Sequence, residues 1–330
     1  MQRVQPGEAM HRPQGRESDA RSGVDDRSSR ARTQRTFLVG CQRSGTTFLQ
    51  AALSSHPRIL SIPETAFFER ALPGRIDDLV RRSLSGAAID ARQRGRDYLR
   101  VQRRVRRALR SVADELGVAT GTLGLHFGLG GYVGEFAGLL DTAAHAGGCH
   151  AWLEKTPNHV FYLDVIERHL PQARFIHLLR RGEDVVASAV DASMRYAGYG
   201  DGRVFWRGVP WWVACWNAAV AAHVQHAGRA NHCIVFYDDL LRNFAGEYAR
   251  LCAFIGVEPV DARLGAHKRI ADLGNEPWKN GALSGQLIPA TPKFDALFGP
   301  DVRSWIRTQL SCYDEVREML CGRIACGSER

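Results

Sequence analysis

The chain has 330 residues, of which 45% are hydrophobic, so it contains enough apolar material for one large folded domain. Its formal net charge of +9 favours anionic partners, which include phosphate-bearing small molecules, nucleic acid and membrane surfaces. The eight cysteines form no CxxC pair, and there is neither a secretory signal nor an apolar run long enough to span a membrane. We therefore predict a cytoplasmic protein with no metal site and no transmembrane segment.

Residues 1–35 differ in composition from the rest of the chain. They are rich in Arg, Ser, Asp, Gln and Gly and nearly free of large aliphatic side chains. Such a segment cannot offset the entropy that is lost when its backbone is ordered. We predict a disordered basic tail over residues 1–35, followed by a single domain over residues 36–330.

Short apolar runs alternate with stretches of helical periodicity in this domain. Thr36–Gly40 is the first run, and helical spacing follows it over Ser44–Ser55. Later runs, each followed by a helical stretch, are Ala151–Glu154, Phe175–Leu179 and Cys233–Tyr237. This alternation is typical of an α/β fold with a central parallel sheet. We predict a P-loop-like, three-layer arrangement.

The alternation stops at about residues 70–148, where we predict a helical insertion. Nine arginines lie between Arg92 and Arg110, and they raise the alternative of an RNA-binding or membrane-binding protein without enzyme activity. However, the apolar residues of this stretch fall on one helical face: Tyr98, Val101, Val105, Leu109 and Val112. We prefer a packed helix with a solvated surface, and we expect no nucleic-acid partner.

Gly40 and Gly45 enclose a loop between the first strand and the first helix. The Gly-x-x-x-x-Gly spacing surrounds an anion with backbone N–H groups at the positive end of a helix dipole. In nucleotide triphosphatases a lysine follows the second glycine, but Thr46 and Thr47 follow it here. The missing lysine argues against ATP or GTP hydrolysis, and Arg43 places a cation inside the loop instead. A P-loop kinase-like phosphotransferase that uses ATP stays an alternative.

The sequence RSGTTF at residues 43–48 resembles the 5'-phosphosulfate loop of sulfotransferases that use 3'-phosphoadenosine 5'-phosphosulfate (PAPS). The resemblance implies transfer of a sulfuryl group from PAPS, with adenosine 3',5'-bisphosphate (PAP) as the product. It also implies which residues hold the 5'-phosphate and the sulfuryl group: Arg43, Ser44, Gly45, Thr46 and Thr47. Phe48 would lie against the adenine, although a place in the helix core is an equal alternative.

A second motif follows the strand Phe175–Leu179. Arg180 stands at the strand end, and Ser188 lies eight residues further along the chain. This spacing resembles the 3'-phosphate motif of the same family, in which an arginine clamps the phosphate and a serine adds a hydroxyl donor. The family usually has Asn-Pro or Asp-Pro after the arginine, whereas Arg181-Gly182 stands here. Either Arg180 or Arg181 is therefore the clamp.

Two shorter segments resemble the family further along the chain. Ile234–Leu241 (IVFYDDLL) resembles its Tyr-Glu-Asp strand end, which implies that Tyr237 lies near the adenine or the 3' side of the cofactor. Trp278-Lys279-Asn280 is similar to a tripeptide that closes the cofactor site in cytosolic members, and Lys279 is a weak candidate. The resemblance covers Thr36 to about Val257, with the insertion unmatched.

Sulfuryl transfer requires a base that removes the acceptor proton and cations that balance charge on the leaving phosphate. Cytosolic members of the family use a histidine within Lys-Thr-His, but Lys155 and Thr156 are followed by Pro157 here. Heparan N-sulfating and tyrosine-sulfating enzymes use a glutamate shortly after the loop helix, and the segment around Glu64 resembles theirs. We predict Glu64 as the base, and Lys155 with Arg43 as the stabilising cations. His159 is the rival base.

The sequence indicates only the broad chemical class of the acceptor. The function that we predict is transfer to a hydroxyl or amine of a carbohydrate, peptide, lipid or small metabolite. By analogy with the glutamate branch, carbohydrate, peptide and lipid-linked acceptors are preferred to small phenols. Four tryptophans of one predicted helix are candidates for stacking on an acceptor, but core packing is the preferred use: Trp206, Trp211, Trp212 and Trp216.

Overall fold

The structure is a computed structural model of the whole chain, which divides into residues 1–32 and residues 33–330. It describes residues 33–85, 98–118, 124–197, 207–261, 270–271, 276–283 and 293–328. The predicted tail therefore lies almost wholly outside the described residues. Its last two residues belong to the first strand, which begins at Gln34 rather than at Thr36.

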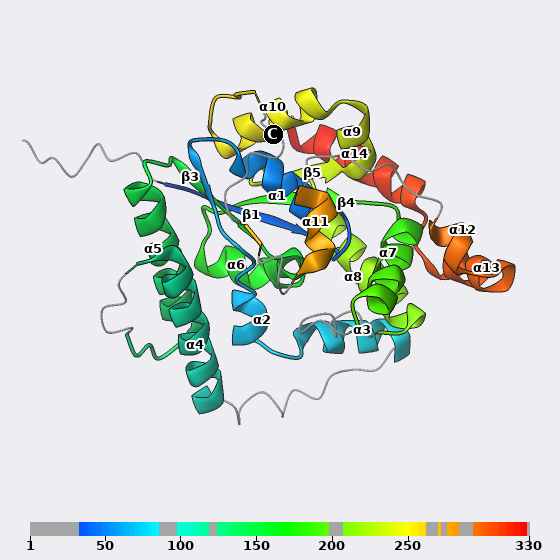
Figure 1. Cartoon of the computed structure of the whole chain (residues 1–330), viewed down its shortest axis with the longest axis horizontal. Coiled ribbons are helices and arrows are strands. Elements are labelled where there is room, and N and C mark those ends of the chain that lie inside the picture. The colour runs from blue at the N-terminus through cyan, green and yellow to red at the C-terminus, as the bar shows by residue number, and fades with distance from the viewer. Residues whose placement is uncertain are drawn as a thin grey trace, which may run out of the picture. The chain divides into compact units, whose positions relative to one another are not determined.

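A parallel sheet of five strands forms the centre of the second unit (Figure 1). The strands are β1 (Gln34–Gly40), β2 (Ile59–Ser61), β3 (Ala151–Lys155), β4 (Arg174–Leu179) and β5 (His232–Phe236), in the order β2-β3-β1-β4-β5. Every neighbouring pair is parallel. The predicted α/β fold with a central parallel sheet is confirmed. The sequence did not predict β2, because three residues are too few to display a pattern.

Helices cover both faces of the sheet, because successive strand residues point to opposite sides. Phe37 of β1 packs in a core with α5 (Leu129–Ala146), α6 (Leu163–His169) and α8 (Val209–His226). Leu38, the next residue, packs on the other side with α1 (Thr46–Ser54) and α10 (Phe244–Ile255). Figure 1 shows α1 and α10 on one side of the strands and α6 on the other. The result is three layers, as predicted.

The remaining helices complete these layers and the insertion. They are α2 (Phe67–Ala71), α3 (Arg75–Ser85), α4 (Tyr98–Leu116), a 3-10 helix (Pro157–Tyr162), α7 (Gly182–Arg195), α9 (Tyr237–Arg242), a second 3-10 helix (Pro277–Lys279), α11 (Asn280–Leu283), α12 (Lys293–Leu297), α13 (Pro300–Gln309) and α14 (Tyr313–Ser328). No described helix is long and apolar enough to cross a membrane. Trp212 and Trp216 of α8 are buried in the core, whereas Trp206 lies outside the described residues.

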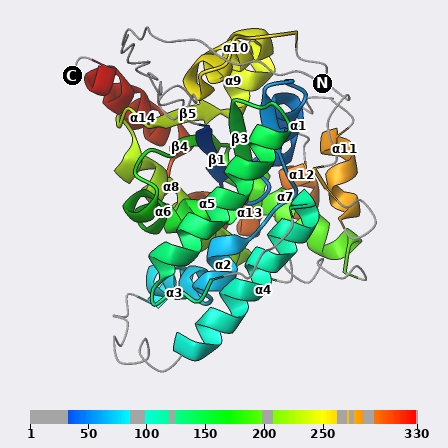
Figure 2. The same cartoon turned by 90° about the vertical axis from the view of Figure 1, so that its left-hand side faces the viewer.

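The described part of residues 70–148 contains α3, α4 and α5 with short non-helical connections. Its helix α4 packs against α2 and α5, and Figure 2 shows α4 and α5 side by side. Val105, Leu109 and Val112 are buried, as the periodicity predicts. The side chains of Tyr98 and Val101 lie outside the described part.

The predicted site residues follow the carboxyl ends of the strands, which all lie at one edge of a parallel sheet. β1 ends at Gly40 and opens into the loop, and β3 ends at Lys155 itself. Arg180 follows β4, and Tyr237 follows β5. Four segments that are distant in sequence therefore meet at this edge.

Candidate active site

Two glycines shape the loop between β1 and α1. A Cβ atom at Gly40 would lie 2.5 Å from the carbonyl oxygen of Leu178, which belongs to the neighbouring strand. A Cβ atom at Gly45 would lie 2.6 Å from Cε2 of Tyr237, and Gly45 also has a φ of 98°. Every other residue carries a Cβ atom, and both distances are shorter than a Cβ atom tolerates, so both positions require glycine. The glycines thus let the loop approach β4 and the ring of Tyr237.

The loop ends at the amino terminus of α1, for which Gly45 supplies no side-chain cap. The N–H groups of Phe48 and Leu49 bond to the carbonyl oxygen of Gly45. The N–H groups before them belong to the first turn, which a helix leaves without intrahelical partners. Such a terminus attracts anions through these donors and through the helix dipole. Ser44 and Thr46 are buried in this turn, and Thr47 is half-buried.

Arg43 connects the loop to the second predicted motif. Its Nε donates a hydrogen bond to Oγ of Ser188 on α7, at 3.2 Å. Burial lowers the pKa of Arg43 to about 10, and the positive charge of Arg180 acts in the same direction. The guanidinium remains charged at neutral pH. It therefore stands as a cation between the two motifs.

Arg180 lies beside the same loop. Its guanidinium carbon is 4.5 Å from the centroid of the Tyr237 ring, which in turn contacts Gly45. Its side chain is 15% exposed, and its Nε donates to Asp184 at 3.4 Å. The indole N–H of Trp216 donates to the carbonyl oxygen of Arg180 at 3.0 Å, which fixes the backbone at the end of β4.

Arg181 points elsewhere. Its side chain is 46% exposed and pairs with Asp238 at 3.5 Å and with Asp314 of α14 at 3.3 Å. Its guanidinium also lies over the ring of Tyr313, 4.8 Å from the centroid. Of the two arginines that the sequence left open, only Arg180 shares a neighbour with the loop.

Glu64 lies between two lysines. Lys155 forms an ion pair with its carboxylate and also donates to Oγ1 of Thr47 at 3.3 Å. Lys279 is 2.8 Å from Oε1 of Glu64 and pairs with Glu276 as well. Lys155 contacts Glu64 and not Glu154, its neighbour in the chain. The sequence signal for Lys279 was only the tripeptide around it, because its partner Glu64 is distant in the chain.

The two lysines control the ionisation of Glu64. Burial alone would raise the pKa of this carboxyl, but the charges of Lys155 and Lys279 outweigh burial and lower the pKa to about 2. Burial lowers the pKa of Lys155, with Glu64 offsetting it in part. At Lys279 the two carboxylates outweigh burial and raise the pKa. Glu64 is therefore ionised throughout the neutral range.

His159, the rival base, is fully buried. Its Nδ1 lies 2.9 Å from Glu154, and its Nε2 accepts from the backbone N–H of Phe68 at 3.4 Å. Glu154 is completed by hydroxyl groups of Thr65 at 2.8 Å and Thr156 at 2.6 Å. Both nitrogens of His159 are thus occupied inside the protein.

Phe48 is 3% exposed, and its ring packs edge-on against Phe244 at 5.7 Å between centroids. This arrangement places the ring in the core of α1, one of the two uses that the sequence left open. Its contact with an adenine stays a prediction. The described residues contain no group of three or more His, Cys, Asp or Glu that could hold a metal ion.

The arrangement joins the glycine loop after β1, the guanidinium groups of Arg43 and Arg180, and the lysine-paired carboxylate of Glu64 at one edge of the sheet. A model of the sulfotransferase family matches residues 35–262, which include the loop, both predicted phosphate motifs and Glu64. The chain belongs to the sulfotransferase family. The predicted family and enzyme class are confirmed, and the match removes the ground for the kinase alternative. No curated protein matches the sequence of this sulfotransferase.

Several solved structures resemble this sulfotransferase. The sulfotransferase domain of the Synechococcus PCC 7002 olefin synthase has 20% identity and a TM-score of 0.50, over 84% of this chain and 94% of that one. This likeness shows the shared fold. A mouse sulfotransferase complexed with PAP has 13% identity and a TM-score of 0.48, over 88% and 89% of the two chains. The sulfotransferase domain from the curacin biosynthetic pathway has 14% identity and a TM-score of 0.45, over 84% and 97%.

Proposed function

We propose that this sulfotransferase transfers the sulfuryl group of PAPS to a hydroxyl or amine of an acceptor, with Glu64 as the general base. The observation that carries the proposal is the contact series from Thr47 through Lys155 to Glu64. Only the side chain of Lys155 stands between the ionised carboxylate of Glu64 and Thr47 of the loop. A base must lie within reach of the reacting centre before its pKa matters.

The residues around the loop fit a nucleotide with anions at both its 5' and 3' positions. The 5'-phosphosulfate belongs at the amino terminus of α1, where Ser44, Gly45, Thr46 and Thr47 supply donors. We assign Arg180 and Ser188 to the 3'-phosphate, because Ser188 accepts a hydrogen bond from Arg43 and the charge of Arg180 acts on Arg43. The ring of Tyr237 lies next to Gly45 of the loop and under the guanidinium of Arg180.

PAPS supplies an activated sulfuryl group on its 5'-phosphate. Glu64 takes the proton of the acceptor hydroxyl or amine as the acceptor atom bonds to sulfur. The bond from sulfur to the phosphate oxygen breaks, and Lys155 and Arg43 balance the charge that this oxygen gains. As Lys155 turns toward that charge, Glu64 loses part of its ion pair and becomes a stronger base. One proton thus moves to Glu64, and PAP leaves with the electron pair of the broken bond.

Two measurements on the purified chain test this assignment. Isothermal titration with PAP and with Mg-ATP determines the nucleotide, and we expect PAP alone to bind tightly. Incubation with labelled PAPS and fractionated extract then identifies the acceptor among carbohydrates, peptides, lipids and small metabolites. With that acceptor, we expect Glu64→Gln to lower the turnover rate by about two to four powers of ten, while PAP affinity changes little.

Glu276→Gln is the matched control, because Glu276 pairs with the same Lys279 and makes no contact with Lys155 among the described residues. Its turnover is expected to stay within about tenfold of the parent chain. Near-normal turnover of Glu64→Gln would show that Glu64 is not the base, and His159 would become the candidate. Tight binding of Mg-ATP instead of PAP would contradict the choice of donor.

A further inference from the structure

The exposed face of α4 concentrates positive charge. Six arginines and no acidic residue lie between Tyr98 and Arg110. At about 100° per residue, the five from Arg103 to Arg110 fill an arc of about 160° opposite the buried Val105 and Val112. Many of them stand three or four residues apart, a spacing at which like charges destabilise a helix. An anionic surface bound to this face would relieve that repulsion.

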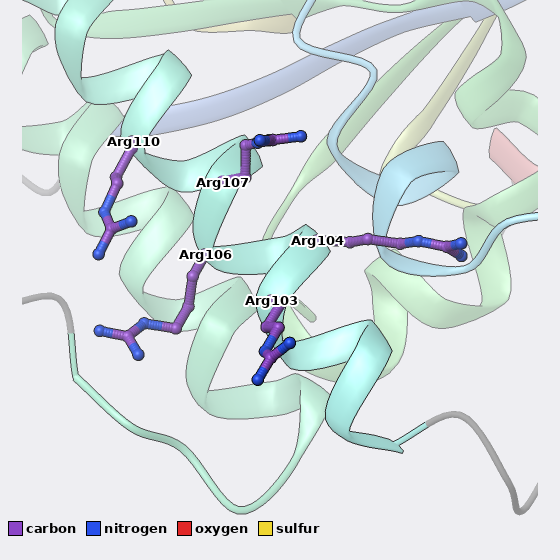
Figure 3. Close-up of a pocket in the computed structure, with 5 residues that line it drawn as sticks. All are labelled: Arg103, Arg104, Arg106, Arg107 and Arg110. Carbon is purple, nitrogen blue, oxygen red and sulfur yellow. The ribbon is translucent and has the colours of Figure 1, made fainter.

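The five arginine side chains line a surface cavity of about 540 Å³: Arg103, Arg104, Arg106, Arg107 and Arg110. Figure 3 shows them extending outward from α4, with Arg104 and Arg107 on one side of the view, Arg106 and Arg110 on the opposite side, and Arg103 between them. Four of them are exposed, and Arg106 is half-buried. Among the described residues, no carboxylate lies within 4 Å of Arg103, Arg107 or Arg110. Elsewhere in the chain, Arg35 and Arg75 each have one at 2.6 Å.

Two large apolar side chains are exposed next to this face. Leu125 is 72% exposed and Phe127 is 100% exposed, in the segment that precedes α5. The segment is held in place, because His126 pairs with Glu135 at 3.0 Å. Gln102 of α4 donates to the carbonyl oxygen of His126 at 3.4 Å, which puts the segment along the Arg106 edge of the basic face.

We propose that this basic face and the Leu125–Phe127 segment together form a docking surface for an anionic lipid bilayer. Arginines attract the phosphate groups of anionic lipids, and neighbouring Leu and Phe side chains enter the boundary between headgroups and acyl chains. The arginines alone would also suit a nucleic acid or a soluble polyanion. The exposed Leu125 beside Phe127 favours the bilayer. An aromatic ring also stacks on nucleobases, whereas an aliphatic side chain gains free energy only by leaving water.

Sedimentation of the full chain with vesicles tests the proposal. We expect partition onto vesicles of phosphatidylcholine mixed with phosphatidylserine, and none onto phosphatidylcholine alone. The triple substitution Arg103→Gln, Arg107→Gln and Arg110→Gln should reduce the partition coefficient about a hundredfold at low salt, since each basic residue near such a surface contributes about fivefold. The double substitution Leu125→Ser and Phe127→Ser should reduce it about tenfold and leave retention on a heparin column unchanged.

Matched controls distinguish the effect of the basic face from the effect of overall charge. Every variant retains residues 1–32, so these residues do not contribute to the differences between variants. Arg168→Gln, Arg242→Gln and Arg307→Gln remove three exposed arginines from other helices and should change partition less than threefold. Val302→Ser, at an exposed position on α13, controls for the apolar change. Circular dichroism confirms that each variant is folded. Equal losses in both arginine triples, or full vesicle binding by the Leu125 and Phe127 variant, would overturn the proposal, and the second result would point to a soluble polyanion.

Discussion

Arg43 and Ser188 are 145 residues apart in the chain, and the Nε of Arg43 donates a hydrogen bond to the Ser188 hydroxyl at 3.2 Å. Arg43 belongs to the loop after β1, and Ser188 belongs to α7 after β4. Because β1 and β4 are adjacent and parallel, both motifs leave the sheet at the same edge. The hydrogen bond therefore brings two predicted phosphate-binding segments into direct contact.

We first predict the effects of replacing Arg180 and Arg181. We expect Arg180→Ala to weaken PAP binding about a hundredfold, because it removes a charged donor from the proposed 3'-phosphate position. Affinity for adenosine 5'-phosphosulfate, which lacks that phosphate, should change less than about threefold. Isothermal titration of both ligands measures the difference. Arg181→Ala is the control and should leave both affinities nearly unchanged, since its side chain pairs with Asp238 and Asp314. Equal losses for both ligands would contradict the assignment of Arg180.

We next predict the effect of a methyl group at Gly45. A methyl group at this position would meet the Tyr237 ring at 2.6 Å on a backbone with φ of 98°. We expect Gly45→Ala to abolish measurable PAP binding and to lower the free energy of unfolding by more than about 2 kcal/mol. Gly74→Ala is a matched control, because Gly74 has a φ of 85° with nothing within 4 Å of its Cβ position. It should cost only the backbone strain, about 1 kcal/mol. Urea unfolding and PAP titration measure both effects, and similar costs would show that the Tyr237 contact is unimportant.

Glu64 makes the third prediction, on stability. Its pKa falls from 4.5 to about 2 on folding, so its ion pairs stabilise the protein fully above about pH 4.5. That contribution is lost as the pH falls through about 2. We expect Glu64→Gln to lower the free energy of unfolding at pH 7 by up to about 3 kcal/mol, and the difference from the parent chain to shrink toward pH 3.

Glu69 is the control of opposite sign. Burial raises the pKa of Glu69 above its ordinary value. Its ionised form therefore costs stability at neutral pH, and this cost disappears as the pH falls below the raised pKa. Glu69→Gln should be neutral or stabilising at pH 7. Urea unfolding at several pH values compares the two variants, and a constant deficit of Glu64→Gln from pH 7 to pH 3 would contradict the proposed ion pairs.

We finally predict the effects of replacing Lys155 and Lys279. Both contact Glu64, but only Lys155 also contacts Thr47 of the loop. We expect Lys155→Met to lower turnover by about two to three powers of ten, because it removes a cation next to the leaving oxygen. Lys279→Met should lower turnover less than about tenfold. Turnover with the identified acceptor and PAP titration measure the two variants. A larger loss at Lys279 would transfer the stabilising role to it.

Local patterns were sufficient for much of the fold and for the loop. Four of the five strands contain a largely apolar run of four or five residues, and the glycine spacing at Gly40 and Gly45 specifies a strand, a turn and a helix without reference to distant residues. The one-sided periodicity of α4 likewise predicted its buried face. These features depend on neighbours within a few positions, so they are visible in the sequence.

Tertiary structure decided the features that depend on distant partners. It placed Lys279 against Glu64, turned Arg180 toward Tyr237 and Arg181 toward α14, and buried His159 between Glu154 and Phe68. Each outcome follows from which strand ends and helices meet at one sheet edge, and no local pattern encodes that. The sequence determined the glycine loop after β1 and predicted that this loop binds an anion. Only the packing of five strands decided which distant cations and which carboxylate surround it, because charge and burial are properties of the assembled chain.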